Sequence, residues 1–295
     1  MANPQLFDRV ALIGLGLIGS SLARVIKSHG LASHICGCAK SEKTRARALQ
    51  LNLVDNIEDK PALCVRNADL VVLCTPIGSY AKLTEEIAPN LKRGAILSDV
   101  GSVKHSVVRV VEPLMPPEAH FVPAHPVAGT EHSGPDAGFE SLFSGHWCII
   151  TPTARTDVKA IKRVSALWEQ AGMQVDLMDA QHHDLVLAIT SHLPHLIAYN
   201  IVGTASDLEH VTQSEVFKYA AGGFRDFTRI ANSDPTMWRD IFLNNREAVL
   251  EMLGRFNEDL SSLQRAIRWE DADALEKLFQ RTRKIRKGIL DAGQA

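Results

Sequence analysis

The stretch Gly14-Leu15-Gly16-Leu17-Ile18-Gly19 decides the fold of this chain. A short apolar run, residues 10–13, precedes it, and a segment with helical spacing of apolar residues, 20–26, follows it. In such a strand–turn–helix frame the glycines have separate tasks: Gly14 makes the tight turn, Gly16 admits a pyrophosphate close to the backbone, and Gly19 lets the helix pack on the strand. Free N–H groups at the helix start, at Leu17 and Ile18, would meet the phosphate charge. The stretch predicts a dinucleotide site.

Further apolar runs along the first 180 residues alternate with amphipathic stretches, which is the rhythm of a parallel sheet with crossover helices. The middle runs are nearly all apolar, as strands buried on both faces should be. We therefore predict an α/β fold in which residues 1–178 form a Rossmann-like dinucleotide-binding domain. The predicted strands are residues 10–13, 35–38, 70–74, 96–99, 121–124 and 148–151.

The chain changes character near residue 178. Between residues 180 and 290 there are only two prolines, and apolar residues recur at helical spacing. This pattern predicts an all-helical domain over residues 179–295. A long helical domain with apolar residues left over often pairs with a second copy, so we expect a homodimer formed through this domain. The basic stretch at 280–288 is interpreted as a solvated last helix rather than a nucleic-acid arm.

Composition narrows the class of partner. Of 295 residues, 32 are basic and 34 acidic, and they are interspersed, so no global field would gather nucleic acid or an anionic membrane. The five cysteines form no C-x-x-C pair, which argues against a disulfide framework or a structural zinc site. No run approaches the roughly 18 consecutive apolar residues of a membrane span, and residues 1–10 contain no apolar segment of the kind found in a secretory leader. We expect a cytoplasmic protein that binds a small molecule.

The second predicted strand ends in Ala39-Lys40-Ser41, where an acid would normally hold the adenosine ribose of NAD. A carboxylate there would repel a 2′-phosphate, whereas a small residue followed by lysine and serine can accept it. These three residues are therefore candidate cofactor contacts, and they favour use of NADP, with NAD left open. The alternative is that Lys40 merely belongs to an exposed helix start.

Polar residues also cluster where other predicted strands end. Thr75-Pro76 and Asp99 follow two of them, and we expect all three residues to contact the cofactor, because ligands of open α/β sheets bind at the carboxyl ends of the strands. The motifs D-x-G-S-V-K and H-P-x-A-G-T-E begin at Asp99 and His125. In the helical half, S-H-L-P-H begins at Ser191 and G-G-F-x-D-x-T-R-I-A at Gly222.

Taken in this order, the four motifs resemble the prephenate/arogenate (cyclohexadienyl) dehydrogenase family of tyrosine biosynthesis, over the chain from about residue 10 to the last helix. The resemblance implies an oxidative decarboxylation of prephenate to 4-hydroxyphenylpyruvate, of arogenate to tyrosine, or of both. Hydride passes to NAD or NADP, the ring carboxylate leaves as carbon dioxide, and the ring becomes aromatic. Nothing in the residues decides between the two substrates.

The resemblance also implies roles for individual residues. His125 matches the catalytic histidine that binds the ring hydroxyl and takes its proton. Ser102 matches the serine that hydrogen-bonds both the ring hydroxyl and this histidine. The alternative for Ser102, compatible with that role, is a helix N-cap. Arg229 matches the arginine that grips a substrate carboxylate. The remaining pocket residues implied are the catalytic candidate His195 and the substrate contacts Ser191, His192, Thr130 and Trp238.

The helical half contains two pairs of histidines that lie close together in the sequence. His192 and His195 are three residues apart, a spacing that could suit a metal, but Pro194 between them and the absence of H-E-x-x-H argue against zinc, so no metal is expected. His182-His183 has no role in the resemblance, and we expect both side chains to be exposed near a helix start.

Two other classes compete with this interpretation. One is another nicotinamide-dependent hydroxyacid or imine dehydrogenase, which would need a catalytic lysine or aspartate where this chain has the Ser191–His195 motif. The other is a redox sensor that binds a dinucleotide without catalysis.

Overall fold

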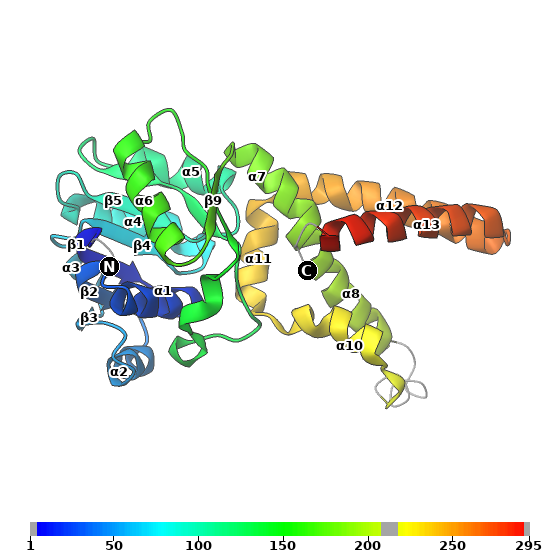
Figure 1. Cartoon of the computed structure of the whole chain (residues 1–295), viewed down its shortest axis with the longest axis horizontal. Helices are drawn as coiled ribbons and strands as arrows, with labels where there is room; N and C mark the ends of the chain where they lie inside the picture. The colour runs from blue at the N-terminus through cyan, green and yellow to red at the C-terminus, as the bar shows by residue number, and fades with distance from the viewer. Residues whose placement is uncertain (1–4, 208–217, 292–295) are drawn as a thin grey trace. The chain divides into compact units, whose positions relative to one another are not determined.

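The computed structural model describes residues 5–207 and 218–291 (Figure 1). Its contacts divide the chain into two compact units, residues 1–246 and 247–295, and each is described by itself. The expected domain boundary at residue 178 falls inside the first unit and stays a prediction.

The first unit is built on a parallel sheet. Among the described residues this sheet has six strands in the order β3-β2-β1-β4-β5-β6, and every neighbouring pair is parallel. The order reverses between β1 and β4, and in open α/β sheets a dinucleotide binds at the carboxyl ends of the strands where the order reverses. The expected Rossmann-like fold is thus confirmed. Its strands are β1 (Phe7–Ile13), β2 (Ala32–Cys38), β3 (Asn56–Glu58), which was not anticipated, β4 (Leu70–Leu73), β5 (Ile96–Asp99) and β6 (His120–Val122).

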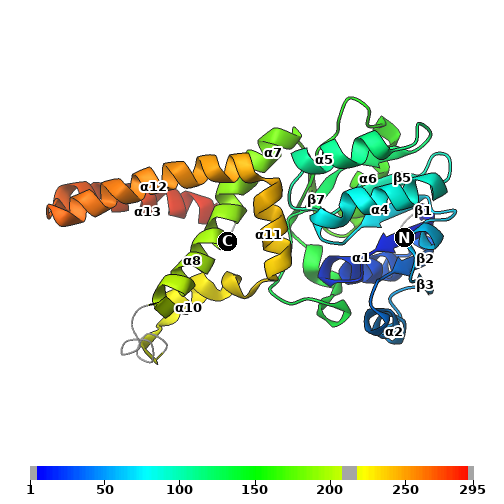
Figure 2. The ribbon, with the colours of Figure 1, turned by 180° about the vertical axis from the view of Figure 1, so that it is seen from behind.

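Both faces of this sheet are covered by helices (Figures 1 and 2). Along β1, Val10 and Leu12 belong to one buried cluster while Ala11 and Ile13 belong to the other, because successive side chains of a strand point to opposite faces. α1 (Leu17–Ser28) and α6 (Val158–Gln170) pack in the first cluster, and α4 (Tyr80–Ile87) and α5 (His105–Val111) in the second. The shorter helices are α2 (Glu42–Gln50), α3 (Pro61–Cys64), η1 (Ile77–Ser79), η2 (Ala88–Asn90), η3 (Glu112–Leu114), η4 (Pro135–Ala137) and η5 (Glu140–Phe143).

A second, small sheet corrects the expected strand over residues 121–124. β6 ends at Val122, and β7 (Ala124–Pro126) pairs antiparallel with β8 (Trp147–Ile150), which pairs parallel with β9 (Gln174–Leu177). Pro123 separates β6 from β7; it has no backbone N–H to donate and so cannot continue the ladder of a central strand. The two runs that we assigned to the parallel sheet therefore lie partly in a separate mixed sheet. The change of sheet brings His125 to the middle of β7.

From residue 180 onward the described residues are helical, as expected; residues 208–217 and 292–295, predicted with them, lie outside the described residues. Pro194 cannot donate an N–H to the carbonyl four residues earlier, and the chain just before it, η6, is wound as a π-helix. Such widened turns occur frequently at functional sites. The elements of the first unit are α7 (Ala180–Leu187), η6 (Ala188–His192), α8 (Leu193–Asp207), α10 (Gly222–Thr228), η7 (Arg229–Asn232) and α11 (Pro235–Asn244).

The continuous helical stretch Ala180–Asp207 is, by length and composition alone, long and apolar enough to cross a membrane, with a mean hydropathy of 1.5 over its most apolar window. It also carries three buried polar side chains, His183, Asp184 and His192, whose hydrogen-bond partners lie on other elements of the first unit. Its composition is therefore weak evidence for a membrane span, because the core helix of a folded domain has the same features.

The second unit is a pair of helices, α12 (Arg246–Arg268) and α13 (Ala272–Asp291). The chain turns between them at Glu270, whose φ of 53° lies in the left-handed region, and the Asp271 carboxylate accepts a hydrogen bond from the N–H of Ala274 at the start of α13.

Candidate active site

The glycine turn has the geometry that each of its three glycines requires. Gly14 has a φ of 102°, and a Cβ on it would lie 2.8 Å from the carbonyl of Cys74. A Cβ on Gly19 would lie 2.1 Å from the carbonyl oxygen of Gly14, so only glycine lets α1 approach the turn this closely. Gly16, in contrast, has nothing within 4 Å of a Cβ position, and it is the N-cap of α1. The open space beside the first N–H groups of a helix, at Leu17 and Ile18, fits a pyrophosphate.

The loop after β2 holds the candidate adenosine contacts. Ala39 is buried and provides no acid, while Lys40 and Ser41 are exposed. Arg45 Nη1 donates to the carbonyls of Ala39 (2.8 Å) and Lys40 (2.9 Å), which fixes the shape of this loop. Ser41 is the N-cap of α2 and its Oγ accepts from the N–H of Thr44 at 3.4 Å, so it also has the structural role of a helix start.

The ends of β4 and β5 differ in what they offer a ligand. Thr75, half-buried just after β4, bonds Ser79 Oγ at 2.8 Å, and Pro76 beside it is exposed. Asp99 is fully buried: Lys104 Nζ donates to its Oδ2 at 2.5 Å, as does the N–H of Gly101 at 2.8 Å. The carboxylate of Asp99 is thus enclosed by protein groups, and a contact between Asp99 and the cofactor stays a prediction. Asp99 neutralises Lys104, whose Nζ also donates to the carbonyl of Ala124 at 2.7 Å, next to His125.

His125, on β7, is 6% exposed, and its imidazole contacts a second histidine. His125 Nδ1 lies 2.8 Å from His183 Nε2, and His183 Nδ1 lies 2.8 Å from Asp184 Oδ1. The carboxylate of Asp184 also accepts from the backbone N–H groups of Lys104 (2.7 Å) and His105 (2.9 Å). Asp184, rather than Ser102, thus caps the start of α5, and Ser102 is left half-buried in the preceding loop.

His183 corrects the sequence-based expectation. It is fully buried, whereas its neighbour His182 is exposed as expected. On a helix, adjacent residues point in different directions, so one of the pair can face the sheet while the other faces away. The contact between His183 and His125 spans 58 residues of sequence, and no local pattern could have indicated it.

All the histidines at this site are held neutral. Burial lowers the pKa of His125 well below its usual range, and the neighbouring Lys104 ammonium would lower it further, as would His183 and His192 if they were protonated. Burial also lowers the pKa of His183, and that of His192 to about 4. A neutral imidazole has one lone pair on nitrogen, which is what a proton acceptor needs.

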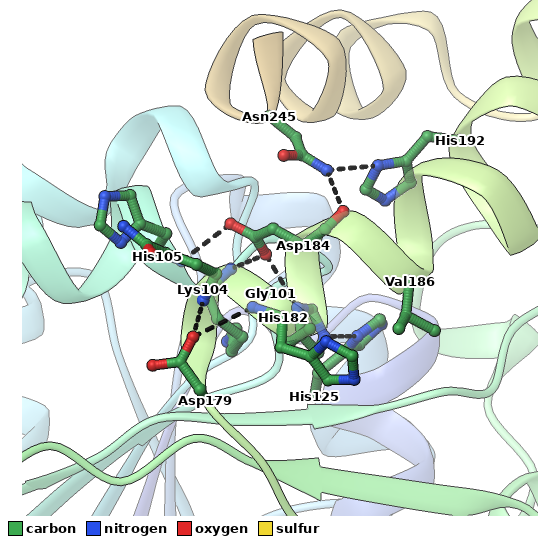
Figure 3. A network of polar contacts seen from close by, with 12 residues as sticks. Gly101, Lys104, His105, His125, Asp179, His182, Asp184, Val186, His192 and Asn245 are labelled. Carbon is green, nitrogen blue, oxygen red and sulfur yellow. Dashed lines mark hydrogen bonds and ion pairs between the residues drawn. The ribbon is translucent and has the colours of Figure 1, made fainter. Parts of the chain in front are cut away.

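A second arm of the network reaches His192. Asn245, 5% exposed, follows α11. Its Nδ2 donates to the backbone carbonyl of Asp184 at 2.8 Å and lies 3.0 Å from His192 Nδ1 (Figure 3). Sequence reasoning did not single out Asn245 or Asp184, because both are recognisable only through their partners on other elements.

His195 and Trp238 form one wall of the site. Their rings are stacked with centroids 3.7 Å apart, and Trp238 is 5% exposed. His195 Nδ1 donates to the carbonyl of Ser191 at 2.9 Å, which leaves its Nε2 with a lone pair. His192 meets the edge of Trp238, with centroids 6.1 Å apart. The three aromatic rings of S-H-L-P-H and α11 are thus brought together.

Arg229 lies at the start of η7, exposed, with its Nη1 3.1 Å from Glu131 Oε2. Glu131 belongs to the loop after β7, so this ion pair joins the H-P-x-A-G-T-E and G-G-F-x-D-x-T-R-I-A motifs across 98 residues. Thr130 is exposed beside it, with its Oγ1 accepting from the N–H of His132 at 3.3 Å. The guanidinium keeps further N–H donors for a ligand carboxylate.

Within the described residues, no group of three or more His, Cys, Asp or Glu side chains is arranged to hold a metal ion. The glycine turn, the reversal of strand order between β1 and β4, and the buried, neutral histidine of β7 define an NAD(P)-dependent oxidoreductase with a Rossmann-like nucleotide domain. The sequence profile of the prephenate dehydrogenase nucleotide-binding domain matches residues 22–177, and that of the prephenate dehydrogenase dimerization domain matches residues 179–281. The chain belongs to the prephenate dehydrogenase family.

Individual relatives agree with this assignment. The chain is 45% identical to the cyclohexadienyl dehydrogenase of Zymomonas mobilis over 283 residues, which cover 96% of each chain. It is 34% identical to the prephenate dehydrogenase of Bacillus subtilis, covering 97% of this chain and 77% of the relative. Among solved structures, prephenate dehydrogenase from Aquifex aeolicus in complex with hydroxyphenyl propionate and NAD+ is 34% identical and superposes with a TM-score of 0.89, covering 96% of this chain and 98% of the other.

Proposed function

We propose that this oxidoreductase converts prephenate to 4-hydroxyphenylpyruvate, arogenate to tyrosine, or both, in tyrosine biosynthesis. The observation that carries the proposal is His125: a buried, neutral imidazole in the H-P-x-A-G-T-E motif, at the carboxyl edge of a dinucleotide-binding sheet. An oxidised nicotinamide, when bound, accepts the hydride from the ring carbon that carries the hydroxyl. The protein must then handle one proton and two or more negative charges.

His125 handles the proton. Its lone pair takes the proton of the ring hydroxyl, and the electron pair of the broken O–H bond forms the carbonyl as hydride leaves. Loss of the ring carboxylate as carbon dioxide returns two electrons to the ring, which becomes aromatic with the charge on the same oxygen. The imidazolium can then give its proton back to that oxygen, so His125 is regenerated within one turnover.

The cationic groups handle the carboxylates. Arg229 supports this role because its exposed guanidinium is held by only one contact to Glu131 and retains N–H donors for a planar carboxylate. His195, whose Nε2 is left with a lone pair, and the stacked ring of Trp238 support a wall for the substrate ring. His192, Ser191, Thr130 and Ser102 complete the set that we assign to the substrate.

Cofactor choice is proposed separately. We infer that the enzyme uses NADP at least comparably to NAD, because Ala39 leaves no carboxylate to repel a 2′-phosphate and Lys40 and Ser41 are exposed beside it. The competing argument is that Ser41 already serves as the N-cap of α2.

A homodimer in the cytoplasm is the proposed state of the protein. Large apolar side chains are exposed on α12, on α13 and in the turn between them. An exposed apolar surface of this kind is typical of a protein–protein interface. The exposed side chains are Leu250, Leu260, Ile267, Trp269, Phe279 and Ile285. Light scattering on the purified chain tests the dimer; a monomeric mass at micromolar concentration would contradict it.

The decisive test of function is an absorbance assay at 340 nm with prephenate and arogenate, each with NAD and with NADP. Turnover with either substrate, accompanied by release of carbon dioxide, is expected. Cofactor binding without turnover of either substrate would identify a non-catalytic dinucleotide sensor. Turnover only with simple hydroxyacids or imines would place the chain with other dehydrogenases.

A further inference from the structure

Three buried groups form a chain of hydrogen bonds behind His125. From the inside outward they are Asp184, His183 and His125, on α7 and β7, and the two links between them are each 2.8 Å long. His183 is 0% and Asp184 4% exposed, so water does not compete for these bonds. Only one side of the His125 imidazole, that of Nδ1, is engaged in the chain.

The donor and acceptor in each hydrogen bond follow from the backbone N–H groups at Asp184, whose role as donors is fixed. Backbone N–H groups can only donate, and those of Lys104 and His105 point at the two oxygens of Asp184. Asp184 is therefore an acceptor on both oxygens, and His183 must carry its proton on Nδ1 to bond it. Neutral His183 then has a lone pair on Nε2, so His125 Nδ1, which lies 2.8 Å from it, must be the donor.

We propose that His183 and Asp184 are positioning residues that fix His125 as its Nδ1–H tautomer and so make Nε2 the proton-accepting atom. That the accepted proton comes from the substrate hydroxyl rests on the proposed function. The tautomer of His125 does not depend on the proposed function. When Nε2 accepts a proton, the imidazolium of His125 keeps its Nδ1–H bond to His183, and the carboxylate of Asp184 lies at the far end to offset the charge.

The charged groups around these hydrogen bonds agree with two histidines that are both neutral before the reaction. His125 is faced by His183 and His192 from the helical stretch and by Lys104 from the loop before α5. His183 is faced by Asp184, Lys104 and, from β5, Asp99. Lys104 is paired with Asp99 in a fully buried contact, which limits its repulsion of a protonated His125.

Asp184 is itself held in place, which a positioning residue requires. The two N–H groups at the start of α5 fix its carboxylate, and Asn245 fixes its backbone carbonyl. Three contacts, two from the start of α5 and one from the residue after α11, thus determine the position of Asp184, and the position of His183, one residue earlier on α7, follows from it.

The kinetic test replaces His183 in two ways. His183→Phe keeps a ring but removes the acceptor, and we expect kcat to fall about 10- to 100-fold, with KM changed less and the acid limb of the kcat pH profile displaced. His183→Gln restores an acceptor oxygen near the position of Nε2, and it should recover most of the lost kcat. His182→Phe, the same change at the exposed neighbour, is the matched control.

A second test reads the tautomer directly and needs no substrate. In ¹⁵N-histidine-labelled protein, the signals of His125 are assigned by their loss in His125→Asn, and their chemical shifts report which nitrogen is protonated. Nδ1–H is expected in the wild type. In Asp184→Asn a single amide oxygen remains for three N–H donors, so the bond from His183 Nδ1–H should weaken and the fraction of His125 with its proton on Nδ1 should fall. Asp179→Asn, at the N-cap of the same helix, should leave the His125 signals unchanged.

The outcomes separate this inference from the proposed function. A wild type that turns over neither prephenate nor arogenate overturns the function, while the NMR shifts still decide the tautomer. Two results would overturn the positioning role of His183 and Asp184. One is a wild-type His125 that carries its proton on Nε2. The other is a His183→Phe variant with the same kcat and pH profile as His182→Phe. If His183→Phe does not fold, the kinetics of His183→Gln and the ¹⁵N-histidine NMR spectrum of the wild type test the proposal.

Discussion

His125 shows how one residue acquires its chemistry from its surroundings. An imidazole free in water titrates near neutrality and is charged part of the time. On β7 it is enclosed, its pKa is lowered by burial and by neighbouring cationic groups, and its Nδ1 is bonded to His183. The imidazole is therefore neutral at physiological pH, so nearly every enzyme molecule has His125 ready to accept a proton.

Replacing this base should affect the rate far more than binding. We expect His125→Asn to lower kcat by about 10²- to 10⁴-fold, because the lost proton acceptor matters mainly in the transition state, while KM changes less. Steady-state kinetics with the preferred substrate and cofactor, across pH, measure the effect. Near-normal kcat at every pH would show that another group is the base.

Arg229 is expected to act on binding instead. In Arg229→Ala, KM for the substrate should rise by roughly 10- to 100-fold while the Kd for the cofactor is unchanged, since a guanidinium–carboxylate pair is about twice as strong as a neutral hydrogen bond. Arg225→Ala, another exposed arginine, on α10, is the control. Equal losses of substrate and cofactor affinity would instead place Arg229 at the phosphates or in the fold.

At the scale of elements, the sequence predicted what local patterns encode. The turn between β1 and α1 was predictable because its three glycines are adjacent and each meets a steric demand within a few residues. The strand predicted over residues 121–124 was wrong, because the change of sheet at Pro123 follows from the pairing of β7 with β8, a partner distant in sequence. His183 was missed for the same reason: its place depends on His125, which is brought to it by another element.

The glycine turn offers a paired test of structure against binding. Gly16→Ala adds a methyl group in open space, so thermal stability should hold while cofactor affinity falls by about 10-fold or more, or about 1.4 kcal/mol. Gly19→Ala adds one at 2.1 Å from the Gly14 carbonyl and should cost about 1–3 kcal/mol of folding stability. Thermal unfolding and cofactor titration by calorimetry distinguish them. Equal melting temperatures for the two variants would contradict the close packing of α1.

The loop after β2 should determine cofactor choice. Ala39→Asp is expected to shift the ratio of kcat/KM towards NAD, because a carboxylate would accept from ribose hydroxyls and repel a 2′-phosphate. Lys40→Ala should reduce kcat/KM for NADP more than for NAD. Both ratios must be measured at one ionic strength, since phosphate contacts weaken with salt. A wild type strongly selective for NAD and indifferent to either substitution would contradict this role of the loop.

At the scale of the whole molecule, ionisable groups are distributed unevenly. The whole chain carries nearly balanced charge, with a net of -2, while most of the buried ionisable side chains among the described residues gather in one region of the first unit. Perturbed pKa values cluster at functional sites, where burial is used to tune protonation. The cost is a pH-dependent stability, because groups that are neutral when folded take up protons when the chain unfolds. The buried ionisable residues at the site are Asp99, Lys104, His125, His183, Asp184 and His192.

That dependence has a definite sign and window. Burial lowers the pKa of His192 from 6.5 to about 4, so between these values the unfolded chain binds a proton that the folded chain does not, and stability falls as the pH falls. At pH 5 this one residue should cost roughly 2 kcal/mol relative to pH 7. Urea unfolding of the wild type, His192→Gln and the exposed-site control His182→Gln at pH 7 and pH 5 measures it. The loss between the two pH values should shrink by about that amount in His192→Gln alone; equal losses in all three proteins would mean that His192 is protonated in the folded state.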